Sequence, residues 1–600
     1  MKLPGYFASF MVALLLMGAS DASDVVQASA VKAEILQGAP VDYSDAIIEG
    51  DLDLSGMTLG PVDFSNAIFR GDVNFKGVNF TGDARFNNAQ FRGAARFEDA
   101  NFSGRTASFL SANFSGGDAI FHNTRFGGAA IFQEVNFSFG NAFFHDARFD
   151  GAAFFHKANF SFGDAIFRNA HFGRAAIFQE VNFGDGEANF DRARFSSSAN
   201  FERVQFGGAA RFEEVHFSGG DVDFERVQFI GGDADFEGGQ FSGGEACFNL
   251  AQFNHTACFL KAIFSGGDAR FTKAEFGSSA SFDEAVFSGG VANFIWANFS
   301  GTAASFARAE FSGGYAKFLG TNFNTPIAVF NGVQFSGGDA CFNSAHFGDH
   351  AIFKEVNFSG GDADFGWVYF GGPADFGEAR FSGDADFEWA IFSETADFEK
   401  AEFDNYAFFE NANFSTDSQI YLNRTEYEKI CIRWDSIKES DLNLDPEAYL
   451  KLMNNYKVLG WFDDYNECYY HFMKIRSIGG LYLGFHWWVN KIFYLAYGYG
   501  AKPEYPLGWS FLTIILFGVI WWGVEPRFND GKSVTTMPEA LRFSSVVFLS
   551  STKLSIDPPE LEAREESWDK SIFLAERVIG SLLFFFFLFA ASTSLLIKIV

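Results

Sequence analysis

Large apolar residues return along residues 48–414 at intervals that alternate between five and six or seven positions. Phenylalanine fills most of these positions, and a small residue, usually alanine, stands two positions before each one. Glycine pairs commonly supply the extra residues of the longer intervals. A period of five matches neither an α-helix, at about 3.6 residues per turn, nor a strand, which alternates every second residue. The pattern therefore excludes one continuous helix or strand and indicates a coil of short repeated units.

The repeat unit reads Ala-x-Phe-x-x, and one side of a square coil can hold one such unit. The large residue would then point to the axis, the small residue would fit where the wall is crowded, and the other positions would face solvent. Four units make a coil of roughly 22 residues, so the segment predicts about 16 stacked coils. With about 4.8 Å between stacked strands, the rod would be about 75–80 Å long.

This unit resembles the pentapeptide-repeat family, whose pattern is Ala-(Asp/Asn)-(Leu/Phe)-x-x; residues 84–86, 100–102 and 396–398 carry it. The chain departs from that pattern in its nearly exclusive use of Phe and in the inserted glycines. Because glycine adopts positive φ at little cost, we expect these glycines to bulge at alternate corners. The resemblance implies an all-β right-handed quadrilateral β-solenoid over residues 44–420.

The first 43 residues differ from the repeat. Lys2, an apolar run over about residues 7–17 and small residues up to Ser23 are typical of a secretory signal peptide, predicted here as residues 1–23. The apolar run is too short to span a bilayer. Residues 24–43 are expected to form a linker. Cleavage after the signal would place the repeat domain on the extracytoplasmic side.

Past Ser418 the glycine and Phe content falls and the composition becomes helical. Asp445 as N-cap, Pro446 in the first turn and Gly460 at the end predict a helix over 446–459. A second helix is expected from about Asp464 to Arg476. Together they predict an α-helical hairpin.

An aromatic segment follows over residues 481–497, with Trp487 and Trp488 suited to a membrane interface. Residues 421–500 are therefore predicted to hold the hairpin and an interfacial segment, and a third membrane span at 481–497 stays open.

Two apolar runs, 507–524 and 578–597, are long enough to cross a bilayer. Residues 501–600 are therefore predicted to be an α-helical membrane domain with these two spans. Between them, residues 538–551 are apolar but too short to span.

This order of span, short helix, polar turn and span resembles the two-helix pore module of potassium-type ion channels. The resemblance implies a tetramer if the module conducts, with a pore-loop-like set formed by Ser550, Ser551, Thr552, Lys553 and Asp557. The turn lacks the two glycines of the family's Thr-Val-Gly-Tyr-Gly-Asp filter and carries Lys553. A carbonyl filter needs glycine-permitted backbone, and lysines at its mouth would repel cations, so the turn disfavours selective potassium conduction.

Asn-x-Ser/Thr sequons recur as a by-product of the repeat, and in an exported chain they are candidate glycosylation sites. They stand at Asn79, Asn101, Asn113, Asn136, Asn159, Asn254, Asn298, Asn357, Asn413 and Asn423.

The charge and the chemistry-bearing residues narrow the function classes. A formal net charge of −31 argues against nucleic acid as a partner. Five cysteines in 600 residues exclude a disulfide scaffold. Cys247 and Cys258 occupy equivalent repeat positions, which explains them better than a metal site does. The sequence shows no CxxC, His cluster, nucleophile–base pair or phosphate loop, so we expect no enzyme activity, cofactor or metal.

Three functions remain in order of preference. The first is a membrane-anchored structural or interaction protein that displays a rigid acidic solenoid, with the lipid bilayer and an unidentified protein or surface as partners. The second is an ion channel or channel-derived sensor. The third, suggested by soluble pentapeptide-repeat proteins, is an acidic DNA mimic, which export and membrane spans disfavour.

Overall fold

The computed structural model describes residues 24–600 apart from 417, 439–440, 443, 480–484, 530, 551, 553–556, 562–567 and 600. The predicted signal peptide lies outside this part. The chain forms two units, which we describe separately: the first ends at Ser418 and also includes residues 426–428, and the second holds the remainder from Gln419.

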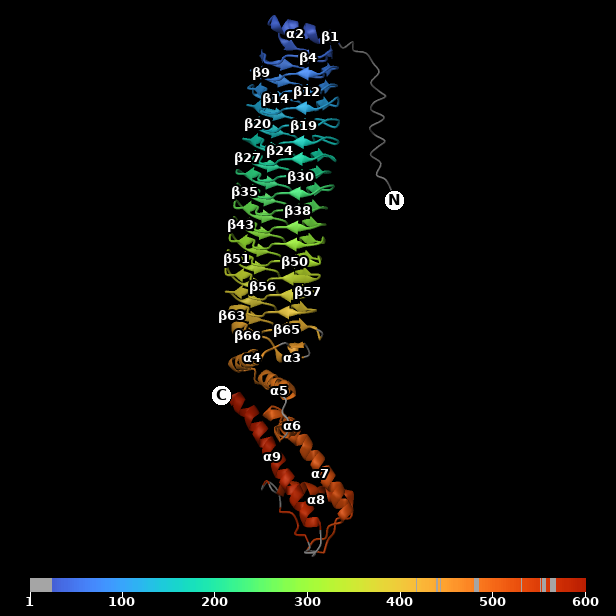
Figure 1. Ribbon diagram of the computed structural model, residues 1–600, viewed down its shortest axis with the longest axis vertical. Coiled ribbons are helices and arrows are strands. Elements are labelled where there is room, and N and C mark those ends of the chain that lie inside the picture. Colours follow the sequence, from blue (N-terminus) through green and yellow to red (C-terminus); the bar gives the residue numbers. More distant parts are fainter. Residues whose placement is uncertain are drawn as a thin grey trace. The chain divides into compact units, whose positions relative to one another are not determined.

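The first unit is a parallel β-solenoid of about 18 turns (Figure 1). A representative coil contributes four short strands: β27 Arg194–Phe195, β28 Ala199–Asn200, β29 Gln205–Phe206 and β30 Ala210–Arg211. β27 pairs in parallel with β23 His171–Phe172 before it and β31 His216–Phe217 after it. This strand pairing confirms the predicted solenoid. The right-handed, square course that the family resemblance implies stays a prediction.

Stacked phenylalanine rings fill the axis of the solenoid, as the apolar pattern predicts. Phe155 is fully buried and stacks on Phe132 and Phe178, with ring centroids 4.9 and 4.8 Å away. It also meets Phe144 and Phe167 edge-on, at 5.5 and 5.3 Å. Stacked and edge-to-face pairs are both favourable for aromatic rings. Each coil therefore buries its rings against the coils above and below, and stability accumulates coil by coil.

The glycines at the corners serve close approach between coils rather than positive φ. A Cβ on Gly128 would lie 2.1 Å from the carbonyl oxygen of Arg105, in the preceding coil, and one on Gly186 would lie 2.2 Å from that of Gly163. The positive φ angles fall instead on the second residue after the inward Phe, usually not glycine, as at Asn169. The expectation that inserted glycines bulge through positive φ is therefore wrong for most of them.

Residues 24–43, expected as a linker, instead begin the solenoid. β1 Val25–Gln27 pairs with β3 Ile47–Glu49, and β2 Val41–Asp42 pairs with β6 Val62–Asp63. Between them, α2 Ala28–Leu36 buries Val31 completely. This helix covers the first coil, which would otherwise expose the ends of its apolar column. The extra coil at this end helps raise the count above 16.

The second unit begins with β65 Gln419–Tyr421, which pairs with β67 Asp441–Leu442, and then adds helices. These are α3 Trp434–Ile437, α4 Pro446–Leu459, α5 Phe462–Gly479, α6 Phe485–Tyr497, the 3₁₀ helix η1 Gly498–Gly500, α7 Glu504–Val524, α8 Met537–Ser550 and α9 Asp569–Ile599.

The hairpin of α4 and α5 follows its sequence signals. Asp445 accepts a hydrogen bond from the Ala448 N–H at 2.8 Å, and Gly460 ends α4 at φ 72°. The Asn455 side chain in α4 is buried and bonds both backbone groups of Ile430, at 3.1 and 2.8 Å. The predicted helix over 446–459 is confirmed to the residue.

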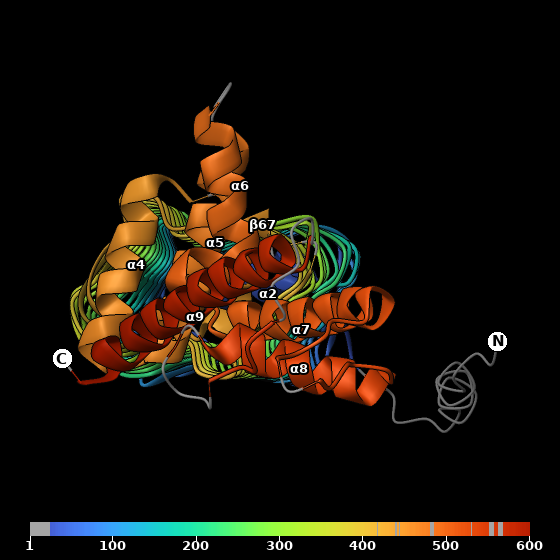
Figure 2. The same ribbon diagram turned by 90° about the horizontal axis from the view of Figure 1, so that it is seen from below.

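Helices α7, α8 and α9 pack against one another (Figures 1 and 2). Two stretches are long and apolar enough to cross a membrane by length and composition, Glu504–Val524 and Asp569–Ser592. α8 is short, as predicted for residues 538–551. Segment 481–497 largely forms α6, of 13 residues.

Candidate functional site

The described pore-loop-like residues lie at the end of α8. Ser550 donates from its hydroxyl to the Val547 carbonyl at 2.7 Å, and Thr552 donates to that of Leu549 at 2.6 Å. Asp557 is exposed. Ser551 and Lys553 lie outside the described residues. The described hydroxyls thus bond to α8 itself, and a role in a pore stays a prediction.

A buried polar cluster, not predicted from the sequence, joins three helices. The Trp521 indole of α7 donates to Glu576 Oε2 of α9 at 2.6 Å. The Ser544 hydroxyl of α8 bonds the other Glu576 carboxylate oxygen and lies 2.9 Å from the Ile514 carbonyl of α7. Trp521, Ser544 and Glu576 are all 0% exposed. This cluster fixes α8 between α7 and α9.

Two glycines let α8 approach its neighbours closely. A Cβ on Gly518 of α7 would lie 2.6 Å from the Leu541 side chain. A Cβ on Gly580 of α9 would lie 2.6 Å from the Phe548 carbonyl oxygen. α8 therefore folds back along the two long helices, since Ser544 reaches a carbonyl ten residues inside the end of α7.

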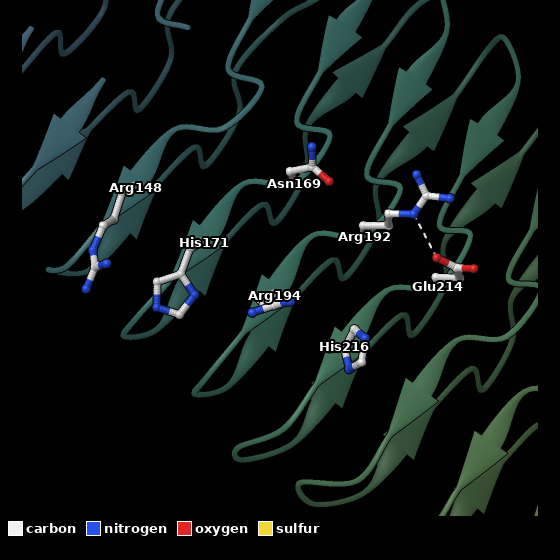
Figure 3. Close-up of a pocket in the computed structure, with 7 residues that line it drawn as sticks. All are labelled: Arg148, Asn169, His171, Arg192, Arg194, Glu214 and His216. Carbon is white, nitrogen blue, oxygen red and sulfur yellow. Dashed lines mark hydrogen bonds and ion pairs between the residues drawn. The ribbon is translucent and has the colours of Figure 1, made fainter. Parts of the chain in front are cut away.

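On the solenoid, five consecutive coils place a cationic or imidazole side chain at one strand position, which we call the basic column. Its members are Arg125, Arg148, His171, Arg194 and His216. Figure 3 shows an open pocket on this column, lined by Arg148, Asn169, His171, Arg192, Arg194, Glu214 and His216. In a chain of net charge −31, the column forms a local cationic surface.

Carboxylates neutralise part of the basic column. Asp150 accepts hydrogen bonds from Arg125 and Arg148, at 2.8 and 2.5 Å. Burial would raise the pKa of Asp150, but these two arginines hold it below its usual value. Within the described part of the chain no ion pair forms with Arg194. Burial, then the charge of Arg148, lower the pKa of His171. Arg194 is therefore the arginine of the column whose positive charge stays unpaired.

Beside this column lies a set of metal-ligand side chains, the His–Asp cluster: His122, His145 and Asp146. The two imidazole rings stack with centroids 4.0 Å apart, and potential donor atoms of all three residues lie within 4.8 Å of one another. Asn169 donates to Asp146 Oδ1 at 3.1 Å. Burial, then the charge of His122, lower the pKa of His145, which favours its neutral form.

No metal-ligand set was predicted from the sequence, so this cluster was not anticipated. Its signal was the 23-residue spacing of His122 and His145, one coil apart. Two further sets pair each of two cysteines with carboxylates: Asp223, Glu225 and Cys247, and Asp235, Glu237 and Cys258. Burial raises the thiol pKa of both cysteines to about 11, so neither offers a thiolate readily at neutral pH.

Half of the candidate glycosylation asparagines belong to ladders of stacked amides. Asn136 donates to Asn113 at 3.3 Å, Asn159 to Asn136 at 3.3 Å, and Asn101 to Asn79 at 2.9 Å. Other sequon amides also bond within the protein: Asn298 to Asn322, Asn357 to Gln334 and Asn423 to the Asp445 N–H. Asn254 and Asn413 are exposed. Glycosylation stays a prediction, and these two sites are the best placed for it.

Comparison with known proteins bears on the solenoid. A family model described as pentapeptide repeats (9 copies) matches residues 43–90, 59–99, 86–136, 178–228 and 368–415. No curated protein and no solved structure matches the chain. The matched ranges fall on the coils whose Phe rings stack along the axis. The matched coils of this solenoid are therefore similar to pentapeptide-repeat proteins.

Proposed function

We propose that this chain is a membrane-anchored structural or interaction protein that displays a rigid acidic β-solenoid on the extracytoplasmic side of a membrane. The carrying observation is an unbroken stack of buried Phe rings in a chain that also holds two helices able to cross a bilayer. About 18 turns at about 4.8 Å each make a rod of about 85 Å. Such a rod offers a long surface for contact with a partner.

The stacked core supports a role as a spacer and platform. Its outward side chains change from coil to coil while most inward positions keep Phe, so the surface can vary without loss of the core. We propose that the rod acts by contact rather than by catalysis, with the bilayer and a protein or surface as its partners.

An aromatic surface on the solenoid supports contact with a partner. Trp367 and Trp389 stack with ring centroids 4.9 Å apart and are 60% and 44% exposed. Tyr369 and Ile391, each two residues further along the chain, are also exposed. Exposed tryptophan and tyrosine are enriched among the residues that carry binding energy in protein interfaces. Together with the basic column, this surface gives the rod two contact regions of different chemistry.

Membrane anchoring has a direct test. Removal of residues 477–600 deletes α7 and α9, the two helices of the described residues that are long and apolar enough to cross a bilayer. The truncated chain is therefore expected to leave the membrane fraction on carbonate washing, while the full chain stays. Retention of the truncated chain would contradict anchoring by α7 and α9. Protease treatment of intact cells then tests the side, because an extracytoplasmic solenoid should be accessible without lysis.

A second candidate, a channel or channel-derived sensor, is favoured by one observation: α8 folds back between two long apolar helices. If the module conducts, four copies must surround a common axis, since one helix pair cannot enclose a path. Replacing Lys553 with glycine should then raise cation conductance in planar bilayers, because it removes a ring of positive charge. A monomer on cross-linking, with no current from either form, would reject the channel and leave the anchor.

A further inference from the structure

We propose that the His–Asp cluster of the solenoid is a Zn²⁺ site in which His122, His145 and Asp146 are the protein ligands. His122 belongs to one coil, and His145 and Asp146 belong to the next. Two imidazoles and one carboxylate are a ligand set that Zn²⁺ accepts with a fourth position open to water. This inference goes beyond display of the rod, because it assigns a specific ligand to one place on its wall.

Neighbouring groups already orient the proposed ligands. His122 Nδ1 lies 3.2 Å from the His145 carbonyl oxygen, which can only accept, so Nδ1 carries the proton and Nε2 keeps its lone pair. Asn169 bonds Oδ1 of Asp146. Oδ2 lies 3.9 Å from His122 Nδ1, the nitrogen that carries the proton, so zinc binding at Nε2 requires the two side chains to rotate. Such outer hydrogen bonds fix tautomer and orientation in metal sites.

The solenoid supplies the rigidity that a metal site needs. The Asn123 N–H donates to the His145 carbonyl at 3.1 Å, and the Asp146 N–H donates to the Arg168 carbonyl at 2.9 Å. Phe121 and Phe144, each directly before one of the histidines, stack at 4.8 Å in the buried core. The two turns are therefore held one coil apart by backbone bonds and by packing, so binding should need only side-chain adjustment.

The ligand types favour zinc over calcium and magnesium. Ca²⁺ and Mg²⁺ prefer all-oxygen sites, which two imidazoles do not provide. The two cysteine–carboxylate sets are the competitors for zinc within the described residues. Their thiols must lose a proton from a pKa near 11, which weakens metal binding at neutral pH.

The test measures Zn²⁺ binding by isothermal titration calorimetry to the full chain in detergent. Cys247 and Cys258 are both replaced by serine, which removes the competing sets. We expect one Zn²⁺ per chain. His145→Ala and Asp146→Asn should each lower the affinity at least about 100-fold, and Asn169→Ala, which removes only an orienting bond, about 10-fold. Co²⁺ in place of Zn²⁺ should give a visible absorption band that His145→Ala abolishes.

His171→Ala is the matched control, because His171 lies in the adjacent basic column and outside the ligand set. Its affinity for Zn²⁺ should stay within about twofold of the parent. Absence of stoichiometric binding would overturn the proposal. So would equal loss in His145→Ala and His171→Ala, or binding that survives in both His145→Ala and Asp146→Asn while circular dichroism shows them folded.

Discussion

Replacement of Phe155 with alanine should destabilise the surrounding coils by about 3–5 kcal/mol, the usual cost of truncating a buried Phe. Phe155 is 0% exposed and contacts rings above, below and within its own coil. The neighbouring rings are held by their own stacks, so they can close the cavity only in part. Each coil contacts only its neighbours, and the loss should therefore be local rather than spread over the rod.

The preceding residue supplies the control. Phe154 points out of the wall and is 36% exposed, so Phe154→Ala should cost less than about 1 kcal/mol. Native-state hydrogen exchange is the suitable measurement, because a long repeat array need not unfold in one step. Amides of the coils around residue 155 should exchange faster in Phe155→Ala alone. Equal exchange in the two variants would mean that the Phe column does not hold the coils together.

The solenoid was the most predictable part of the chain, because one residue type at one spacing marks its axis. The first coil was missed for the same reason. Its inward positions hold Val41 and Tyr43 rather than Phe, and α2 interrupts the pattern. The role of the corner glycines was also misread, because a sequence shows that a residue is small without showing what lies 2 Å from its missing Cβ.

The candidate sites differ in how well they can be predicted from the sequence. His122 and His145 are one coil apart and could have been aligned from the repeat, but the coil length varies, so the pairing needs the strand register. Trp521, Ser544 and Glu576 lie far apart in the chain and share no motif. Only the packing of α7, α8 and α9 brings them together.

Replacement of Glu576 with alanine should loosen α8 from α7 and α9 and cost about 2–4 kcal/mol. The change removes the acceptor of two buried donors, the Trp521 indole N–H and the Ser544 hydroxyl. A buried donor left unpaired costs about 1–3 kcal/mol. Ser544 can still bond the Ile514 carbonyl, which reduces the part of the stability loss that comes from Ser544. The indole N–H has no second acceptor within the described residues, so most of the loss should come from Trp521.

Two variants separate the hydrogen bonds from the packing. Glu576→Gln keeps a carbonyl acceptor of similar size, so its cost should be about half that of the alanine variant. Leu574→Ala lies on the same helix but is 63% exposed, so it should change stability in detergent by less than about 0.5 kcal/mol. Thermal unfolding of the full chain and protease cleavage of residues 537–550 measure the two effects. If Glu576→Ala melts and is cleaved like Leu574→Ala, the buried cluster does not hold α8. If stability rises from Glu576→Ala through Glu576→Gln to wild type, the carboxylate is the group that keeps the short helix α8 folded back between α7 and α9.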